Sequence, residues 1–141
     1  MKLLFIFLLL VGVLISSCNK NKNHPVPNIP FDKTINITLP SYSDLMGVGG
    51  WCYVAGGSKG IIVYRRGVDD FVAFDRHSPA DENGDCGTPL TPDNDNYLVL
   101  NDVCNDASFS LYDGSPISNS EFGLRQYQTQ WNGNEMLRIF N

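Results

Sequence analysis

Residues 75–86 contain the densest group of side chains that could bind a metal ion. Within these twelve positions lie one histidine, one cysteine and four carboxylates: Asp75, His77, Asp81, Glu82, Asp85 and Cys86. Imidazole, thiolate and carboxylate groups are the ligands of protein-bound zinc, and they usually recur at short paired spacings. No such pair repeats in this stretch, so we expect a solvated acidic loop here rather than a metal site.

Part of the same stretch has the spacing of a calcium-binding loop. Asp81, Asn83 and Asp85 alternate as the first three ligands of an EF-hand loop do. Cys86 then stands where the loop needs glycine, and Pro92 stands where the bidentate glutamate belongs. These two departures exclude an EF-hand.

Nucleophilic catalysis would need a base beside the nucleophile. His24 lies in a polar, proline-rich segment, which leaves His77 as the histidine of the expected folded part. Ser78 is next to His77, but neighbouring side chains on an extended segment point to opposite faces. We expect no enzymatic activity, and we expect His77 to be a loop residue hydrogen-bonded to Asp75 or Asp81.

The first eighteen residues are typical of an exported lipoprotein. A basic start precedes thirteen residues, 3–15, that are apolar apart from one glycine; Ser16, Ser17 and Cys18 follow. These features define a secretory signal, and the apolar run is shorter than the roughly 20 residues that span a bilayer. Residues 14–18 resemble a bacterial lipobox, which implies cleavage before Cys18 and lipidation of its thiol. The alternative is an ordinary secreted protein in which Cys18 is incidental.

We predict three parts in the chain: a signal peptide at 1–17, a flexible tether at 18–30 that begins with lipidated Cys18, and a domain at 31–141. The tether is polar, basic and proline-rich, which is the composition of an extended linker. Asn19 is not the aspartate associated with inner-membrane retention, so we expect an outer-membrane lipoprotein of the cell envelope that faces the periplasm.

The charge of the mature chain argues against nucleic acid as a partner. Loss of Lys2 with the signal lowers the basic residues from 10 to 9 against 15 acidic ones, a net charge of −6. Binding to a phosphate backbone needs a basic surface.

The rest of the chain has the pattern of short β-strands. Residues 35–39 alternate between apolar and polar, as a half-buried strand does. Short runs rich in β-branched and aromatic residues occur at 51–54, 61–64, 71–74 and 97–100. One short helix is expected at 41–46, with Ser41 as its N-cap. We predict an all-β domain, either a sandwich or a small barrel.

Three stretches resemble the Rieske iron–sulfur family. Residues 71–81 are similar to the strand and loop that end in Cys-x-His in that family, and residues 97–108 to the stretch with Cys-x-x-His-Gly. Residues 109–116, 124–127 and 137–141 are similar to its closing strands, with a Gly-x-Pro turn and a Leu-x-x-Tyr strand. The resemblance implies a small antiparallel β-sandwich or barrel with two loops at one tip.

The positions that would hold the cluster lack most of its ligands. A Rieske 2Fe–2S cluster is bound by two cysteines and two histidines. Ser78, Ala80, Cys104 and Ala107 occupy those positions, so one ligand is left. The resemblance therefore implies a domain that has kept the fold and lost the cluster, and we predict no cofactor and no metal.

The resemblance also bears on the cysteines. With Cys18 lipidated, the domain contains Cys52, Cys86 and Cys104, and the cell envelope permits disulfides. Because the two loops meet at one tip of a Rieske fold, the resemblance implies a disulfide between Cys86 and Cys104. The alternatives are three free thiols or another pair. Cys52 lies in an apolar run and is expected to be a buried, inert thiol.

Three hypotheses for function remain. The first is a non-redox binding or structural module, held at the membrane by its lipid and presenting loops to a protein partner. The second is a 2Fe–2S electron carrier with substitute ligands such as Cys86, His77 and Cys104 plus one carboxylate. The third is an unrelated β-sandwich lipoprotein. The missing ligands favour the non-redox module. A measurement of iron content would distinguish it from the electron carrier. Convergence of the loops after Phe74 and Val103 would distinguish it from an unrelated β-sandwich.

Overall fold

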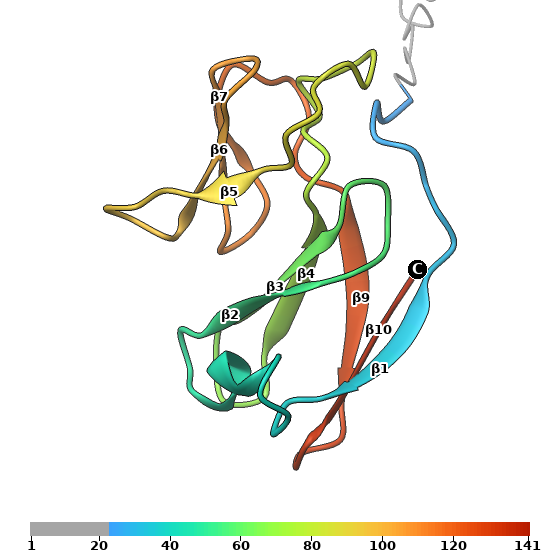
Figure 1. Cartoon of the computed structure of the whole chain (residues 1–141), viewed down its shortest axis with the longest axis vertical. Helices are drawn as coiled ribbons and strands as arrows, with labels where there is room; N and C mark the ends of the chain where they lie inside the picture. The colour runs from blue at the N-terminus through green and yellow to red at the C-terminus, as the bar shows by residue number, and fades with distance from the viewer. Residues whose placement is uncertain (1–22) are drawn as a thin grey trace, which may run out of the picture.

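The computed structural model describes residues 23–141. The predicted signal peptide, the lipidation of Cys18 and the start of the predicted tether lie outside these residues. The described chain forms ten strands and one short 3-10 helix, arranged in two antiparallel sheets (Figure 1). The prediction of an all-β fold is confirmed. Within 23–141, no helix is long and apolar enough to cross a membrane.

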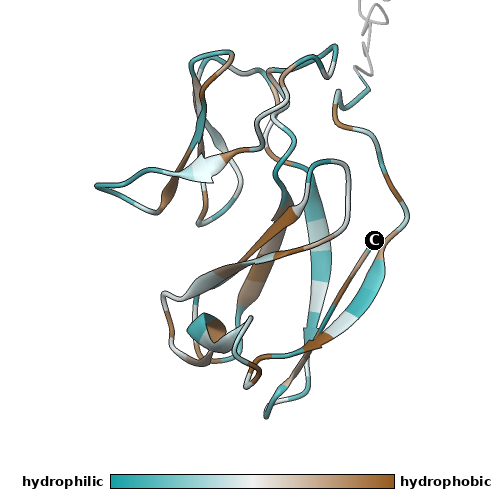
Figure 2. Cartoon of the chain, in the orientation of Figure 1, coloured by the Kyte–Doolittle hydropathy of each residue, from teal (hydrophilic) through white to brown (hydrophobic). Residues whose placement is uncertain are grey.

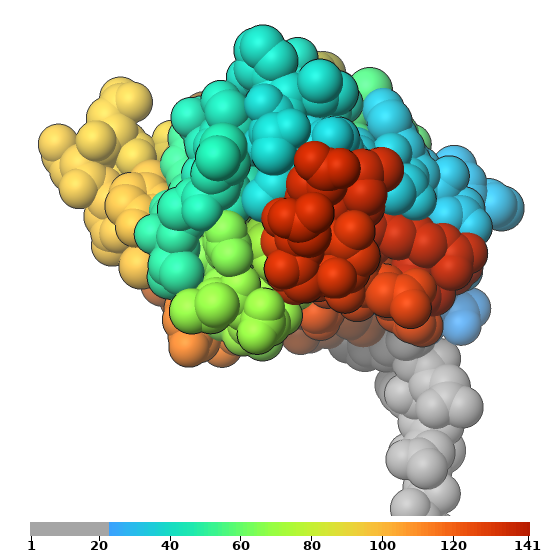
Figure 3. Space-filling view, turned by 90° about the horizontal axis from the view of Figure 1, so that it is seen from below, coloured from blue at the N-terminus to red at the C-terminus, as the bar shows by residue number. Residues whose placement is uncertain are grey.

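Six strands form the larger sheet, called the body here. In spatial order they are β1 (Asp32–Asn36), β10 (Met136–Phe140), β9 (Gln126–Trp131), β4 (Phe71–Asp75), β3 (Ile61–Arg65) and β2 (Trp51–Val54). All neighbours are antiparallel. The helix η2 (Ser43–Met46) lies against β2. Seen from below, the segment around η2, the β3–β4 turn and the β9–β10 turn cover this end of the body (Figure 3).

The smaller sheet, called the lobe, is formed by the chain between β4 and β9. Its strands, in order, are β5 (Thr91–Pro92), β6 (Val99–Asp102), β7 (Ala107–Ser110) and β8 (Pro116–Ser118). The chain leaves the body at Asp75 and returns at Arg125, and the backbone N–H of Asp75 donates to the carbonyl of Arg125 at 2.9 Å. The lobe is therefore an insertion between two neighbouring strands of the body.

Two apolar cores lie on opposite faces of β3 and β4. Ile61 and Val63 of β3 belong to the core inside the body, whereas Ile62 and Tyr64 belong to the core between body and lobe, together with Phe109 of β7. Both strands are thus buried on both faces, which explains why they are continuous apolar runs without alternation. Figure 2 shows the contrast between apolar β4 and the more polar β9 and β1.

Predicted and observed elements agree best where the chain is buried. The strand at 51–54 matches β2, and those at 61–64 and 71–74 are each one residue shorter than β3 and β4. The strand expected at 35–39 begins earlier, at Asp32, and ends at Asn36 because the Asn36 side chain accepts the Thr38 N–H and starts a turn. The strand expected at 97–100 begins at Val99, because residues 96–98 form a turn.

The prediction for the short helix is partly wrong. It is a single 3-10 turn, Ser43–Met46, and Tyr42 rather than Ser41 occupies the N-cap position, without a side-chain capping bond. The Ser43 hydroxyl donates to the carbonyl of Pro40 at 3.2 Å, which links the start of the turn to the segment before it.

The end of the predicted tether packs against the domain, and residues 24–30 are called the strap here. His24 donates through Nε2 to the carbonyl of Gly123 at 2.9 Å. Val26 is fully buried, and its carbonyl accepts two bonds from Arg125, at 2.9 and 2.6 Å. Asn141 donates to the carbonyl of Ile29 at 2.7 Å. The packed part of the chain therefore includes His24, which lies seven residues before the predicted boundary at Phe31.

Candidate functional site

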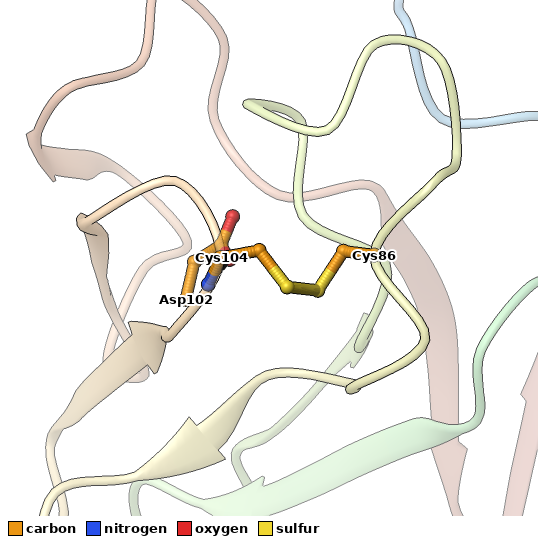
Figure 4. A group of neighbouring side chains, drawn as sticks. All are labelled: Cys86, Asp102 and Cys104. Atoms are coloured by element: carbon orange, nitrogen blue, oxygen red, sulfur yellow. Dashed lines mark hydrogen bonds between the residues drawn. A yellow bond between two sulfur atoms is a disulfide. The ribbon is translucent and has the colours of Figure 1, made fainter.

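Two loops meet at one end of the lobe, and together they are called the tip. The first, residues 76–90, joins β4 to β5; the second, residues 103–106, joins β6 to β7. A disulfide between Cys86 and Cys104 connects them, with Cα atoms 6.0 Å apart (Figure 4). The predicted disulfide is thus confirmed. Cys52 is free and buried, and burial, with a smaller contribution from Asp44, raises the pKa of its thiol to about 12.

The four positions that the Rieske resemblance assigns to ligands offer no free ligand set. Cys104 is in the disulfide, and Ala107 is buried at the start of β7. Ser78 is buried, and its hydroxyl accepts the Ala80 N–H at 3.2 Å. Ala80 packs against the core between body and lobe. Three of these positions, 78, 80 and 104, are in the two loops, and the fourth is at the foot of the second loop.

Asp102 joins the disulfide in the one group of the described residues with metal-ligand spacing. Its carboxylate and the sulfurs of Cys86 and Cys104 lie within 4.8 Å of one another (Figure 4). The carboxylate accepts the N–H groups of Cys104 and Asn105 at 2.9 and 3.2 Å, and the Asn105 side-chain amide at 2.9 Å. Burial favours the neutral acid, but these bonds and one from Ser78 outweigh it and lower the pKa of Asp102.

This group does not fit a metal ion. Metal ligation needs thiolates, and the two sulfurs are bonded to each other. The Asp102 carboxylate already accepts from four donors, which uses the usual capacity of its two oxygens. The group acts as a connection between the loops.

A second buried carboxylate, Asp75, organises the base of the first loop. It accepts the N–H groups of Ser58, Lys59 and His77 at 2.7, 3.2 and 2.8 Å, and the Tyr127 hydroxyl at 2.9 Å. Burial and the bond to Asp75 raise the pKa of Tyr127. The expectation of a solvated acidic loop is wrong for Asp75, because these four donors replace its hydration.

The turn between β2 and β3 supplies the Ser58 and Lys59 donors. Gly57 lies in it at φ +65°, and a Cβ at this position would fall 2.4 Å from the Asp75 carboxylate. Glycine is therefore required for the turn to approach the carboxylate so closely.

Asp81 is also buried rather than solvated. It forms an ion pair with Lys59 at 2.7 Å and accepts the Cys86 N–H at 3.2 Å. Lys59 donates in addition to the Cys86 carbonyl. Burial favours the neutral acid, but the bonds from Lys59 and Cys86 outweigh it and lower the pKa of Asp81. Glu82 and Asp85, by contrast, are exposed as expected.

The shortest side-chain contact of His77 is with Ser58, which is not among the residues predicted from the sequence. Its Nδ1 lies 2.7 Å from the hydroxyl of Ser58, and its Nε2 lies 3.4 Å from the carbonyl and 3.7 Å from the carboxylate of Asp81. Its backbone N–H donates to Asp75. The expected links to Asp75 and Asp81 are therefore present. The signal for Ser58 was the sequence Gly-Gly-Ser-Lys-Gly at 56–60, which has the Gly-x-Ser-x-Gly spacing.

Ser58, His77 and Asp81 have the composition of a catalytic triad, but they lack its nucleophile elbow and its oxyanion hole. A nucleophile elbow joins a strand to a helix, whereas Ser58 lies in a turn between two strands. An oxyanion hole needs backbone N–H groups free to bind the developing charge, and those of Ser58 and Lys59 bind Asp75. Asp81 is paired with Lys59. The three residues instead link the β2–β3 turn to the first loop.

Two open clefts lie at or beside the tip, and the first of them borders the disulfide. One of about 390 Å³ is lined by Ala80, Asp81, Glu82, Asn83, Asp85, Cys86, Cys104 and Asn105. Another of about 640 Å³ is lined by Pro79, Ala80, Glu82, Asn105, Asn119, Ser120, Glu121 and Phe122. Their linings are predominantly polar and carry carboxylates, so they suit a hydrated contact rather than an apolar ligand.

In comparisons with known proteins, the chain matches no protein-family model and no curated protein.

Proposed function

We propose that this chain is a lipid-anchored protein of the cell envelope whose Rieske-like domain carries no cluster and serves as a non-redox binding or structural module. One observation carries the proposal: the two loops that the resemblance assigns to cluster binding meet, and a disulfide joins them where ligands would be needed. An unrelated β-sandwich gives no reason for these two loops to converge, so their convergence supports the resemblance.

The tip does not fit a 2Fe–2S cluster. Such a cluster needs four protein ligands, and positions 78, 80 and 107 carry a serine and two alanines. Substitute ligands are also engaged: the sulfurs of Cys86 and Cys104 form the disulfide, and His77 is buried against Ser58. An electron carrier would need to break the disulfide and dismantle this network, which disfavours the second hypothesis.

The anchoring part of the proposal is based on residues 1–18. Their apolar run and lipobox-like ending support lipidation at Cys18 in the outer membrane, with the domain facing the periplasm. Several acyl chains on one residue make a durable anchor, because each buried methylene contributes about 0.8 kcal/mol.

The test is a metal and mass analysis of the full mature protein extracted from membranes without oxygen. We expect no iron, no acid-labile sulfide, and an intact mass that contains the acyl groups and is lower than the fully reduced value by two hydrogen atoms. The matched variant Cys86→Ser should also lack iron. Two irons and two sulfides per chain would reject the cluster-free module, and an unacylated mass would reject the anchor.

A further inference from the structure

The strap changes how far the domain can move from a lipid on Cys18. Its contacts are distributed along its length: His24 on Gly123, the buried Val26 beneath Arg125, and Ile29 on Asn141. The His24 ring also packs edge-on against Phe122, with ring centres 5.7 Å apart. Since these contacts reach residues about 100 positions away along the chain, they hold the strap in place only in the folded domain.

The chain between Cys18 and the strap is called the leash here, and its greatest possible length follows from covalent geometry. A tether that reached Phe31 would contain thirteen residue steps from Cys18 and could extend about 45 Å. The strap leaves six steps, from Cys18 to His24, and a reach of about 21 Å. A compact domain of about 120 residues has a radius of gyration of roughly 14 Å and is about 35 Å across. The shorter leash is therefore about three fifths of the width of the domain, and it restricts which surfaces can reach the bilayer.

The leash begins beside the tip. Asn23 and Pro25 line a cleft of about 430 Å³ together with Glu82, Glu121 and Phe122. In Figure 1 the first described residues lie at the same end of the long axis as the loop after β4, and η2 and the β3–β4 turn lie at the opposite end. We infer that the strap makes the tip the membrane-proximal surface of the domain and keeps the η2 end away from the bilayer. This inference depends on the proposed anchor at Cys18.

The two ends differ in chemistry, so the orientation determines which kind of surface meets the bilayer. The tip exposes Glu82 and Asp85, and the cost of burying a charge keeps this surface out of the hydrocarbon of the bilayer. The opposite end exposes Met46, Val48 and Val68, and Arg65 donates to the carbonyls of both Met46 and Val68, which holds these apolar residues on one surface. The apolar residues thus point away from the membrane, toward the compartment that the domain faces.

Energy transfer to the membrane surface tests the inference. The full lipidated protein would be inserted into preformed phosphatidylethanolamine–phosphatidylglycerol vesicles with an acceptor dye on a fraction of the headgroups. An azide-bearing amino acid at position 82 or 68 would carry the donor dye, which leaves the cysteines untouched. We expect a transfer efficiency at position 82 that exceeds the one at position 68.

The second arm of the energy-transfer experiment releases the strap. The double change His24→Ala and Val26→Ser should bring the ratio of the two efficiencies toward one, whereas Pro27→Ala, at an exposed strap position, should leave it unchanged. Equal efficiencies in the parent protein, with the protein floating with the vesicles, would overturn the inference and leave the anchor standing. Protein that does not float would overturn the anchor itself, and the inference with it.

Discussion

The body and the tip are stabilised by different kinds of interaction. Strands β3 and β4 are buried by apolar side chains on both faces, whereas the tip is held by one disulfide and by the buried carboxylates Asp75, Asp81 and Asp102. Apolar packing tolerates conservative exchanges, while a polar network fails when one partner is removed. The body is therefore expected to determine whether the chain folds, and the tip to determine the shape of one end.

Loss of apolar volume should have the largest effect. Phe74 is almost completely buried in β4 and packs between body and lobe. Phe74→Ala should lower the free energy of unfolding by about 3–5 kcal/mol, and both sheets should unfold together. Urea denaturation followed by circular dichroism measures this. Val68→Ala, at an exposed position, is the control and should stay within about 0.5 kcal/mol of the parent.

Removal of the disulfide should have a smaller and more local effect. The paired change Cys86→Ser and Cys104→Ser opens a loop with a sequence separation of 18, which the loop-entropy model values at about 3 kcal/mol. Native-state hydrogen exchange should accelerate in residues 78–90 and 103–106 well before it does in β3 and β4. Uniform acceleration across both regions would contradict the division into body and tip.

Asp75 lies at the border of the two regions and tests how they are joined. Asp75→Asn keeps the shape but removes acceptor capacity from a site with four donors. An unpaired buried donor costs about 1–3 kcal/mol, so we expect a loss of that size in urea denaturation. Asp69→Asn, at an exposed position in the β3–β4 turn, serves as the control; a loss as large as that from Asp75→Asn would mean that charge alone is being measured.

Acid should weaken the tip before the body. The pKa values of Asp81 and Asp102 are lowered in the folded protein. Groups with depressed folded pKa values add stability that is present above the unfolded value of about 3.9 and is lost as pH falls through the folded value. The protection factors of the two loops, which correct exchange for its intrinsic pH dependence, should therefore fall below about pH 4, and Asp81→Asn should remove part of this change. Loss of protection in β3 and β4 at the same pH would count against the prediction.

The smallest effect concerns reactivity and involves no loss of stability. Ser58 should not react with a fluorophosphonate probe, because the N–H groups that would stabilise the adduct are bound to Asp75. Intact mass after incubation measures the modification. One adduct per chain that is absent in Ser58→Ala would reject the expectation that the protein is not an enzyme.

The sequence was most informative where local pattern and burial coincide. Residues 51–54 could be predicted as a strand because their composition alone favours one. The pairing of Cys86 with Cys104 could be predicted only through the family resemblance. Of the Asp75 network, only the link to His77 could be predicted, because the other three donors come from the β2–β3 turn and from β9, which no local pattern places beside residue 75. The packing of the strap could not be predicted either, because its composition is that of a linker and its partners, Gly123 and Arg125, lie near the other end of the chain.

The insertion of the lobe between two neighbouring strands of the body has a consequence for how the chain can vary. The lobe begins at Asp75 and ends at Arg125, two residues joined by one backbone hydrogen bond of 2.9 Å. A segment that leaves the body after one strand and returns before the neighbouring strand can gain or lose residues without shifting the register of those two strands. The lobe is therefore the part of the molecule in which new loop lengths could be explored at little cost, while the apolar faces of β3 and β4 limit how much of it could be deleted.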